Sequence, residues 1–261
     1  MVNTFVAESL EVALPGVFTI ENIAISGTHS HNAPGMFQAY LIYQSSGLGF
    51  VHETFDAWVK GITTAVVEAY RNLKPTETTV QKGMLFGTNI NRSPTSYILN
   101  PADEQKQYEL EGDTDKKFLQ LEMKDADTKK TSAVLNWFAV HGTSSNKTNT
   151  LVSGDNRGLA SYYLERDFNG VNVAPGHGKI VTAFASTNLG DVSPNTAGPL
   201  CRGGPAEGQQ CDALTSTCDG TNTYCYAFGP GVDGDMYQST QLIADKQYKY
   251  SKKLMVSSYN Y

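Results

Sequence analysis

Residues 133–140 (AVLNWFAV) constrain the fold of this chain more than any other stretch, because they form an almost continuous apolar run. A run of this length and composition is typical of a β-strand that is covered on both faces. We therefore expect a sheet packed between other layers rather than an open ribbon. The length of 261 residues is sufficient to bury a substantial core around such a sheet.

Helical periodicity alternates with short strand-like runs along the rest of the chain. In residues 53–73 apolar side chains recur at helical spacing up to Pro75, which predicts an amphipathic helix. Residues 153–170 and 233–255 are predicted to form two further helices. Strands are predicted at four more places, namely residues 22–26, 84–87, 118–123 and 179–186. This alternation predicts an α/β fold with a mixed sheet flanked by helices.

The charge balance argues against nucleic-acid binding. Acidic residues outnumber basic residues by 26 to 20, giving a formal net charge of -6, whereas nucleic-acid binding requires clustered Lys and Arg. The short basic cluster at residues 246–253 is better explained as a solvated helix face.

No apolar run approaches the roughly 20 residues that span a bilayer. The first 16 residues lack a basic region followed by a continuous apolar core, so they do not resemble a signal peptide.

All four cysteines lie in one window that is rich in Gly, Thr and Asp and poor in apolar residues. They are Cys201, Cys211, Cys218 and Cys225. Two disulfides that staple a surface loop explain this pattern, with three connectivities open. A four-cysteine zinc site is the alternative, but such sites usually show paired C-x2-4-C spacing, which is absent here. We favour disulfides and therefore an extracytoplasmic location.

Chemically versatile side chains follow several of the predicted strands. His29 and His31 lie one residue apart in a loop that contains Gly and Pro, and His141 directly follows the apolar run. Arg92 and Ser193 lie in loops beyond two other predicted strands. Loops at the carboxyl ends of parallel strands gather at one edge of a sheet. If these strands are parallel and near one another, we expect these five side chains to converge on one site, together with Asp191 from the same loop as Ser193.

Each of these residues has both a functional and a structural interpretation. The three histidines would supply nitrogen ligands to zinc, and Arg92 would stabilise a developing oxyanion. Alternatively, His141 is a core histidine bonded to backbone, and Arg92 pairs with a nearby carboxylate. Ser193 would be a nucleophile or only a turn residue before proline, and its surroundings do not form a G-x-S-x-G elbow.

Five motifs occur in an order and at separations that resemble the neutral ceramidase family. They are ISGTHSHNAPG, NINRSP, NWFAVHGTS, SGDNRGLASY and NLGDVSPN. The cysteine-containing segment and the DMYQSTQLI segment after it are also similar, so the resemblance covers nearly the whole chain from about residue 22. It implies zinc-dependent hydrolysis of the amide bond of ceramide, which yields sphingosine and a free fatty acid.

The resemblance also implies a role for individual residues. His29 and His141 match zinc ligands of the family. His31 and Arg92 match residues that line its active site and handle the substrate carbonyl and proton transfer. Ser193 matches the proposed catalytic serine. The sequence leaves open whether this serine attacks directly or assists a water activated by zinc.

The chain also departs from the family pattern. The family's catalytic domain begins upstream of the first motif and continues beyond the last, where it supplies a glutamate and a tyrosine ligand and an immunoglobulin-like domain. We therefore expect residues 1–261 to be a partial catalytic domain. The alternative is a truncated, non-catalytic protein that binds lipid or a full-length partner. An amidohydrolase barrel also carries H-x-H, but it needs more βα units and leaves GDVSPN and the cysteine loop unexplained.

A ceramide substrate has consequences for partners and location. A lipid substrate implies peripheral contact with a membrane, although no anchor is visible in the sequence. Together with the disulfides, it implies an extracellular, secretory or cell-surface location. The oligomeric state is left open.

Overall fold

The computed structural model describes residues 1–47 and 49–257, which form two compact units. The first unit comprises Met1–Gly27 and Ala33–Pro75, and the second comprises Thr28–Asn32 and the chain from Thr76 onward. The five residues that contain both histidines of the H-x-H loop therefore belong to the second unit, whereas the chain on either side of them belongs to the first.

The first unit is built on two helices, α1 (Val2–Ala13) and α3 (His52–Arg71), which pack against each other. The short helices α2 (Leu41–Gln44) and η1 (Ser45–Gly47) precede α3. Helix α3 confirms the helix predicted at residues 53–73. The strand predicted at residues 22–26 is wrong, because Ile23 and Ile25 pack on the core between the two helices and pair with no strand among the described residues.

The second unit contains a four-stranded sheet in the order β1-β3-β4-β5. The strands are β1 (Thr76–Met84), β3 (Lys117–Asp125), β4 (Thr131–Phe138) and β5 (Val181–Ser186). Strand β3 runs antiparallel to β1 and β4, and β5 runs parallel to β4. Consequently β1, β4 and β5 share one direction, and their carboxyl ends lie at one edge. The predicted mixed sheet flanked by helices is confirmed.

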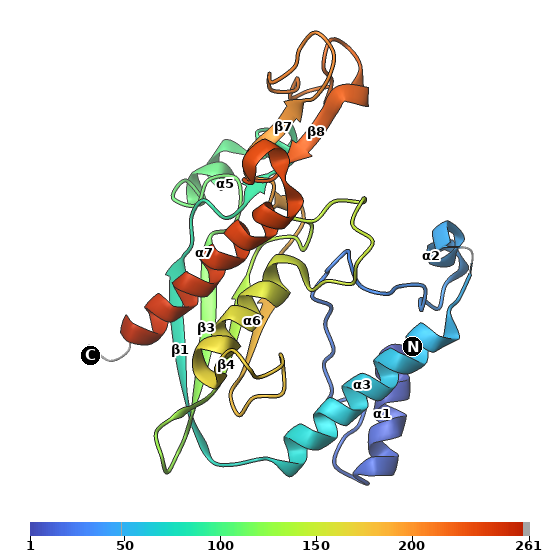
Figure 1. Cartoon of the computed structure of the whole chain (residues 1–261), viewed down its shortest axis with the longest axis vertical. Coiled ribbons are helices and arrows are strands. Elements are labelled where there is room, and N and C mark those ends of the chain that lie inside the picture. Colours follow the sequence, from blue (N-terminus) through green and yellow to red (C-terminus); the bar gives the residue numbers. More distant parts are fainter. Residues whose placement is uncertain (48, 258–261) are drawn as a thin grey trace. The chain divides into compact units, whose positions relative to one another are not determined.

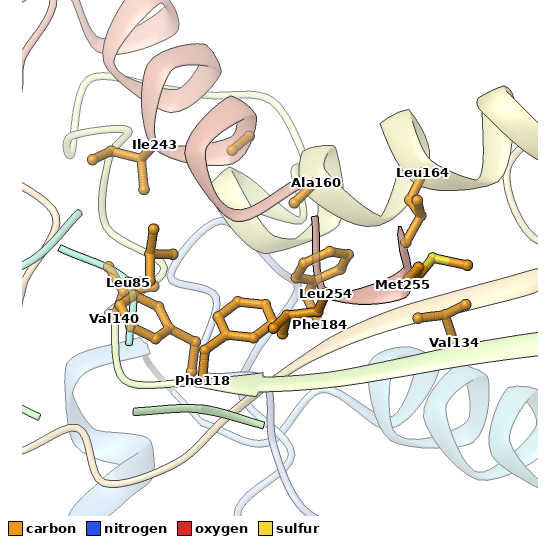
Figure 2. Close-up of a cluster of buried hydrophobic side chains, with 12 residues drawn as sticks. Leu85, Phe118, Val134, Val140, Ala160, Leu164, Phe184, Ile243, Leu254 and Met255 are labelled. Carbon is orange, nitrogen blue, oxygen red and sulfur yellow. The ribbon is translucent and has the colours of Figure 1, made fainter. Parts of the chain in front are cut away.

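Helices α6 (Asp155–Asn169) and α7 (Met236–Ser257) cover one face of this sheet (Figure 1). Figure 2 shows the apolar side chains gathered between these helices and the strands. Phe118 is central to the cluster, with its ring centroid 5.7 Å from that of Phe138 and 5.2 Å from that of Tyr250. Leu135 and Trp137 lie on the opposite face and are only half-buried. The apolar run had predicted that β4 is covered on both faces. This prediction is wrong for the face that carries Leu135 and Trp137.

Two small antiparallel ladders extend the second unit. Strand β2 (Ile90–Asn91) pairs with β6 (Val192–Ser193), and β7 (Gly198–Cys201) pairs with β8 (Cys225–Phe228). The β7–β8 hairpin carries the disulfides Cys201–Cys218 and Cys211–Cys225. The predicted disulfides are confirmed, and the thiolates that a zinc site requires are not available. The remaining short helices are α4 (Pro94–Tyr97), α5 (Ala102–Gln107), η2 (Asn222–Tyr224) and η3 (Val232–Gly234). None of the described helices is both long and apolar enough to cross a membrane.

Candidate active site

His141 lies at the carboxyl edge of the sheet, three residues beyond the end of β4, and is buried. Its Nδ1 lies 2.5 Å from the carbonyl oxygen of Val192. Because a carbonyl only accepts hydrogen bonds, Nδ1 carries the proton, and the lone pair of Nε2 is left for a ligand. His141 is therefore a buried histidine bonded to backbone, as the structural interpretation expected. Its Nε2 is the atom that the functional interpretation would use as a ligand.

The H-x-H loop lies directly against the segment that follows β4. Ser30 forms a parallel bridge with Gly142, and the amide of His31 donates to the Gly142 carbonyl at 3.3 Å. A Cβ atom at Gly142 would come within 3.0 Å of the Ser30 Cα and 3.1 Å of the His29 carbonyl oxygen. Glycine therefore allows this close approach, because a side chain here would require the loop to shift by a few tenths of an ångström.

The three imidazoles form one cluster. The ring centroid of His29 lies 4.9 Å from that of His141 and 4.8 Å from that of His31, and the latter two centroids are 6.3 Å apart. His29 has a backbone φ of 59°, in the left-handed region that non-glycine residues rarely adopt. His29 and His31 are exposed, whereas His141 forms the buried floor of the cluster.

The β2–β6 ladder brings Arg92 and Ser193 to the same edge. Ser193 pairs with Ile90, and the amide of Arg92 donates to the Asp191 carbonyl at 2.9 Å. The Arg92 Nη2 donates to the Gly190 carbonyl at 3.2 Å, and its Nε lies 3.7 Å from the Asp191 carboxylate. The carboxylate pairing foreseen for Arg92 is therefore present, although more than half of the side chain remains exposed.

Ser193 is buried, and its hydroxyl accepts a hydrogen bond from the amide of Asn195 at 3.1 Å. This contact is that of a turn residue, as the serine-proline sequence suggested. Ser193 also follows Val192, whose carbonyl holds His141. Within the described part of the chain no hydrogen bond joins the Ser193 hydroxyl to a histidine nitrogen, so the serine is near the cluster but is not paired with a base there.

The electrostatics of the cluster favour the neutral form of His29 and of His141. Burial is the main cause that lowers the pKa of His141. The hydrogen bond to the Val192 carbonyl raises this pKa, whereas Arg92, His29 and His31 lower it through their positive charge. Desolvation also lowers the pKa of His29, followed by the charges of His31, Arg157 and Arg92. Since only a neutral imidazole has a lone pair for a cation, both shifts favour metal coordination at neutral pH.

Imidazole nitrogen is a ligand that zinc accepts, so the chemistry of His29 and His141 is compatible with a zinc ion. Among the described residues, however, the only three potential ligands with their ligating atoms within 4.8 Å of one another are Cys201, Cys211 and Cys218, and these cysteines are in disulfides. Among the described residues the histidine cluster therefore does not bring three ligating atoms within 4.8 Å of one another.

The role of Asn89, three residues before Arg92, could not be foreseen from the sequence. Asn89 is buried, and its Nδ2 donates to the carbonyls of Ala139 at 2.6 Å and Asp115 at 3.0 Å. It therefore ties the segment that carries Arg92 to the segment that carries His141. Residues 155–157 were likewise recognised only as part of a helix and a motif, although Asn156 donates to the His141 carbonyl at 2.9 Å. A buried polar residue in a loop has no periodic pattern that would distinguish it from an exposed one.

The fold and the cluster define a mixed α/β protein with a histidine-rich site at the carboxyl edge of its sheet. A family profile described as "Neutral/alkaline non-lysosomal ceramidase, N-terminal" matches residues 1–260. The chain belongs to this family, as its motifs suggested.

Relatives and solved structures agree with this assignment. Neutral ceramidase A of Dictyostelium discoideum is 42% identical over 244 residues, which cover 94% of this chain and 33% of the relative. Neutral ceramidase of Drosophila melanogaster is 44% identical over 241 residues, which cover 92% and 33%. The crystal structure of neutral ceramidase from Pseudomonas aeruginosa superimposes with a TM-score of 0.74 at 29% identity, covering 97% of this chain and 34% of that one. The chain thus spans about a third of the length of these relatives.

Proposed function

We propose that this chain carries part of the active site of a zinc-dependent ceramidase, which hydrolyses the amide bond of ceramide to sphingosine and a free fatty acid. The observation that carries the proposal is the cluster of His29, His31 and His141 beside Arg92 and Ser193, in a member of the ceramidase family. The names of the relatives support the substrate, and the neutral imidazoles support the metal.

Zinc would be held by His29 and His141, and when bound it supplies a Lewis acid that polarises a carbonyl and lowers the pKa of water. The chain's own contribution to holding it is the hydrogen bond from Nδ1 of His141 to Val192, which fixes the ring and leaves Nε2 free. Val192 belongs to the same two-residue strand as Ser193, so the ring is held by the strand that also carries the serine.

Arg92 and His31 carry the charge and the proton of amide hydrolysis. The guanidinium of Arg92 is anchored at the Gly190 carbonyl and remains largely exposed, so it is free to bind a substrate oxygen on which negative charge develops. The exposed imidazole of His31 lies beside His29 and delivers a proton to the leaving amine nitrogen. Ser193 lies close to these groups as the nucleophile or as an aid to an attacking water.

The disulfides of the β7–β8 hairpin support an extracytoplasmic location, because such bonds persist in oxidising compartments. A ceramide substrate further requires peripheral access to a membrane surface.

Metal analysis and turnover of the purified 261-residue chain test the proposal together. We expect one zinc per chain and release of fatty acid from ceramide, both lost in His29→Ala and in His141→Ala. His177→Ala is the matched control, because His177 is exposed and lies in the loop before β5. Turnover that survives complete removal of the metal would refute the zinc dependence.

Among the described residues the histidines do not form a group of three ligating atoms within 4.8 Å, and this also favours a second candidate. In that case the chain is a non-catalytic member of the family that binds lipid or a full-length partner. Zinc well below one equivalent together with no turnover, but with retained binding to ceramide-containing vesicles, would support this candidate over the enzyme.

A further inference from the structure

We propose that Arg157, with its neighbours Asp155 and Asn156, is a positioning residue that holds the H-x-H loop and His141 in place for the metal. The inference rests on the proposed function. These three consecutive residues begin α6 and hydrogen-bond to the loop on both sides of His29 and His31. We refer to them as the α6 clamp.

Arg157 holds the loop on its amino-terminal side. Its guanidinium is buried, with 2% of the residue exposed, and Nη1 donates to the carbonyl of Thr28 and to the hydroxyl of Ser186. The Ser186 hydroxyl in turn donates to the same Thr28 carbonyl at 3.2 Å. Thr28 directly precedes His29, whose φ of 59° must be maintained by its surroundings. Arg157 thus fixes the peptide from which His29 projects.

Asp155 holds the loop on its carboxyl-terminal side. Its carboxylate is 1% exposed and accepts from the side-chain amide of Asn32 at 3.1 Å. It also accepts from the amides of Ser144 and Ser145, at 3.0 Å and 2.9 Å, in the loop that follows His141. One carboxylate therefore connects the residue after His31 to the segment that carries His141.

Asn156 completes the clamp at His141 itself. Its Nδ2 donates to the His141 carbonyl at 2.9 Å, and its Oδ1 accepts from Gln247 of α7 at 3.1 Å. Asn156 is fully buried, so these bonds are shielded from water. The helix layer thereby supports both the buried and the exposed histidines of the cluster.

The energetics of Arg157 indicate that it does more than fill space. Its Nε and Nη2 have no hydrogen-bond partner among the described residues, and burial lowers its pKa to about 10. Leaving buried donors unpaired is unfavourable, and a neutral side chain of similar length would avoid the penalty. The side chain is nevertheless placed where its Nη1 bonds the loop before His29.

The test uses Arg157→Met, which removes the charge and the donors but keeps a long side chain. In the metal-free chain we expect hydrogen–deuterium exchange in peptides covering residues 26–33 to accelerate about ten- to a hundredfold, because a charge-assisted hydrogen bond is lost. We expect zinc affinity, measured by chelator competition, to fall by a similar 10–100-fold. Arg166→Met is the matched control, since Arg166 lies in the last turn of the same helix.

Two further variants keep the inference falsifiable. Arg157→Lys retains the charge and one donor site, so it should restore part of both effects. If Arg157→Met does not fold, the exchange rates of residues 26–33 in Arg157→Lys are the test of the clamp. Asp155→Asn tolerates the φ of 52° at this position but replaces one acceptor oxygen with a donor, and it should also accelerate exchange in residues 26–33.

Unchanged exchange in residues 26–33 in the Arg157 variants overturns the clamp, and so does acceleration spread evenly over the second unit, which a merely structural role would produce. These exchange rates do not depend on metal or substrate. Failure of the proposed function is a separate outcome, because it is detected as absent zinc or absent turnover in the parent chain.

Discussion

Asn89→Ala should destabilise the second unit strongly, although Asn89 lies in a loop. Its Nδ2 donates to the carbonyls of Ala139 and Asp115, and its Oδ1 accepts from the Thr114 hydroxyl at 3.1 Å and from the Lys116 ammonium at 2.5 Å. Each neutral hydrogen bond contributes about 1 kcal/mol and each bond to a charged group ~1.5–3 kcal/mol. The loss of all four lowers the free energy of unfolding by roughly 4–6 kcal/mol.

Lys116 is the reason for placing the loss toward the upper end of that range. This lysine is buried, and burial lowers its pKa. Without the Asn89 side chain it retains the Asn89 carbonyl at 3.1 Å and the Thr114 hydroxyl as partners for a buried ammonium. A buried charge that is less well solvated by the protein is strongly unfavourable.

Tryptophan fluorescence measures this loss for the second unit alone. The chain has two tryptophans, Trp58 in α3 and Trp137 in β4. In a Trp58→Phe background, Trp137 reports the unfolding of the sheet in urea. Asn100→Ala is the matched control, because Asn100 is exposed in the same unit. A loss below about 1 kcal/mol, or an equal loss in the control, would refute the reasoning.

Three further predictions concern the hairpin, the histidines and the serine. Replacing Cys211 and Cys225 with serine opens a bridge with a sequence separation of 14 and should lower the free energy of unfolding by ~3 kcal/mol; an unchanged urea midpoint would contradict this. The pKa values of His29 and His141 lie below that of unfolded histidine, so the unfolded state takes up protons first. The contribution of these two histidines to the free energy of unfolding of the metal-free chain is therefore constant well above pH 6.5 and falls below about pH 6.5; a thermal midpoint that does not change between pH 8 and 5 would count against it. Ser193→Ala should slow fatty-acid release at least ~100-fold while zinc remains bound, and a parental rate would remove the serine from the mechanism.

The regular elements with strong periodicity could be predicted from the sequence. The apolar run at residues 133–140 predicted a strand, and β4 is there. The helical spacing at residues 53–73 predicted a helix, and α3 is there. Strand β1 was expected only at its last residue, Met84, because its sequence TETTVQKGM is mostly polar, as suits an exposed edge strand. The strand expected at residues 22–26 illustrates the opposite error, since a short apolar run also fits a segment that packs on helices.

The convergence of the candidate site residues could be predicted in part, because loops at the carboxyl ends of parallel strands lie at one edge of a sheet. Strands β1, β4 and β5 share a direction, so the loops that carry Arg92, His141 and Ser193 start from the same edge. The H-x-H loop reaches that edge by a different route, through the bridge between Ser30 and Gly142. The pairing of the cysteines and the contacts of the α6 clamp depend on three-dimensional geometry that spacing alone does not specify.

The contacts of the H-x-H loop are remote along the chain, and this has a consequence for biosynthesis. Thr28 and Arg157 are separated by 129 residues, and Asn32 and Asp155 by 123. At a translation rate of ~5–20 residues per second, the loop leaves the ribosome on the order of 10 s before its partners. During that interval its imidazoles are exposed on a nascent polypeptide. The loop can therefore adopt its native arrangement only after α6 has been synthesised. Contacts between residues so far apart in the sequence also form slowly.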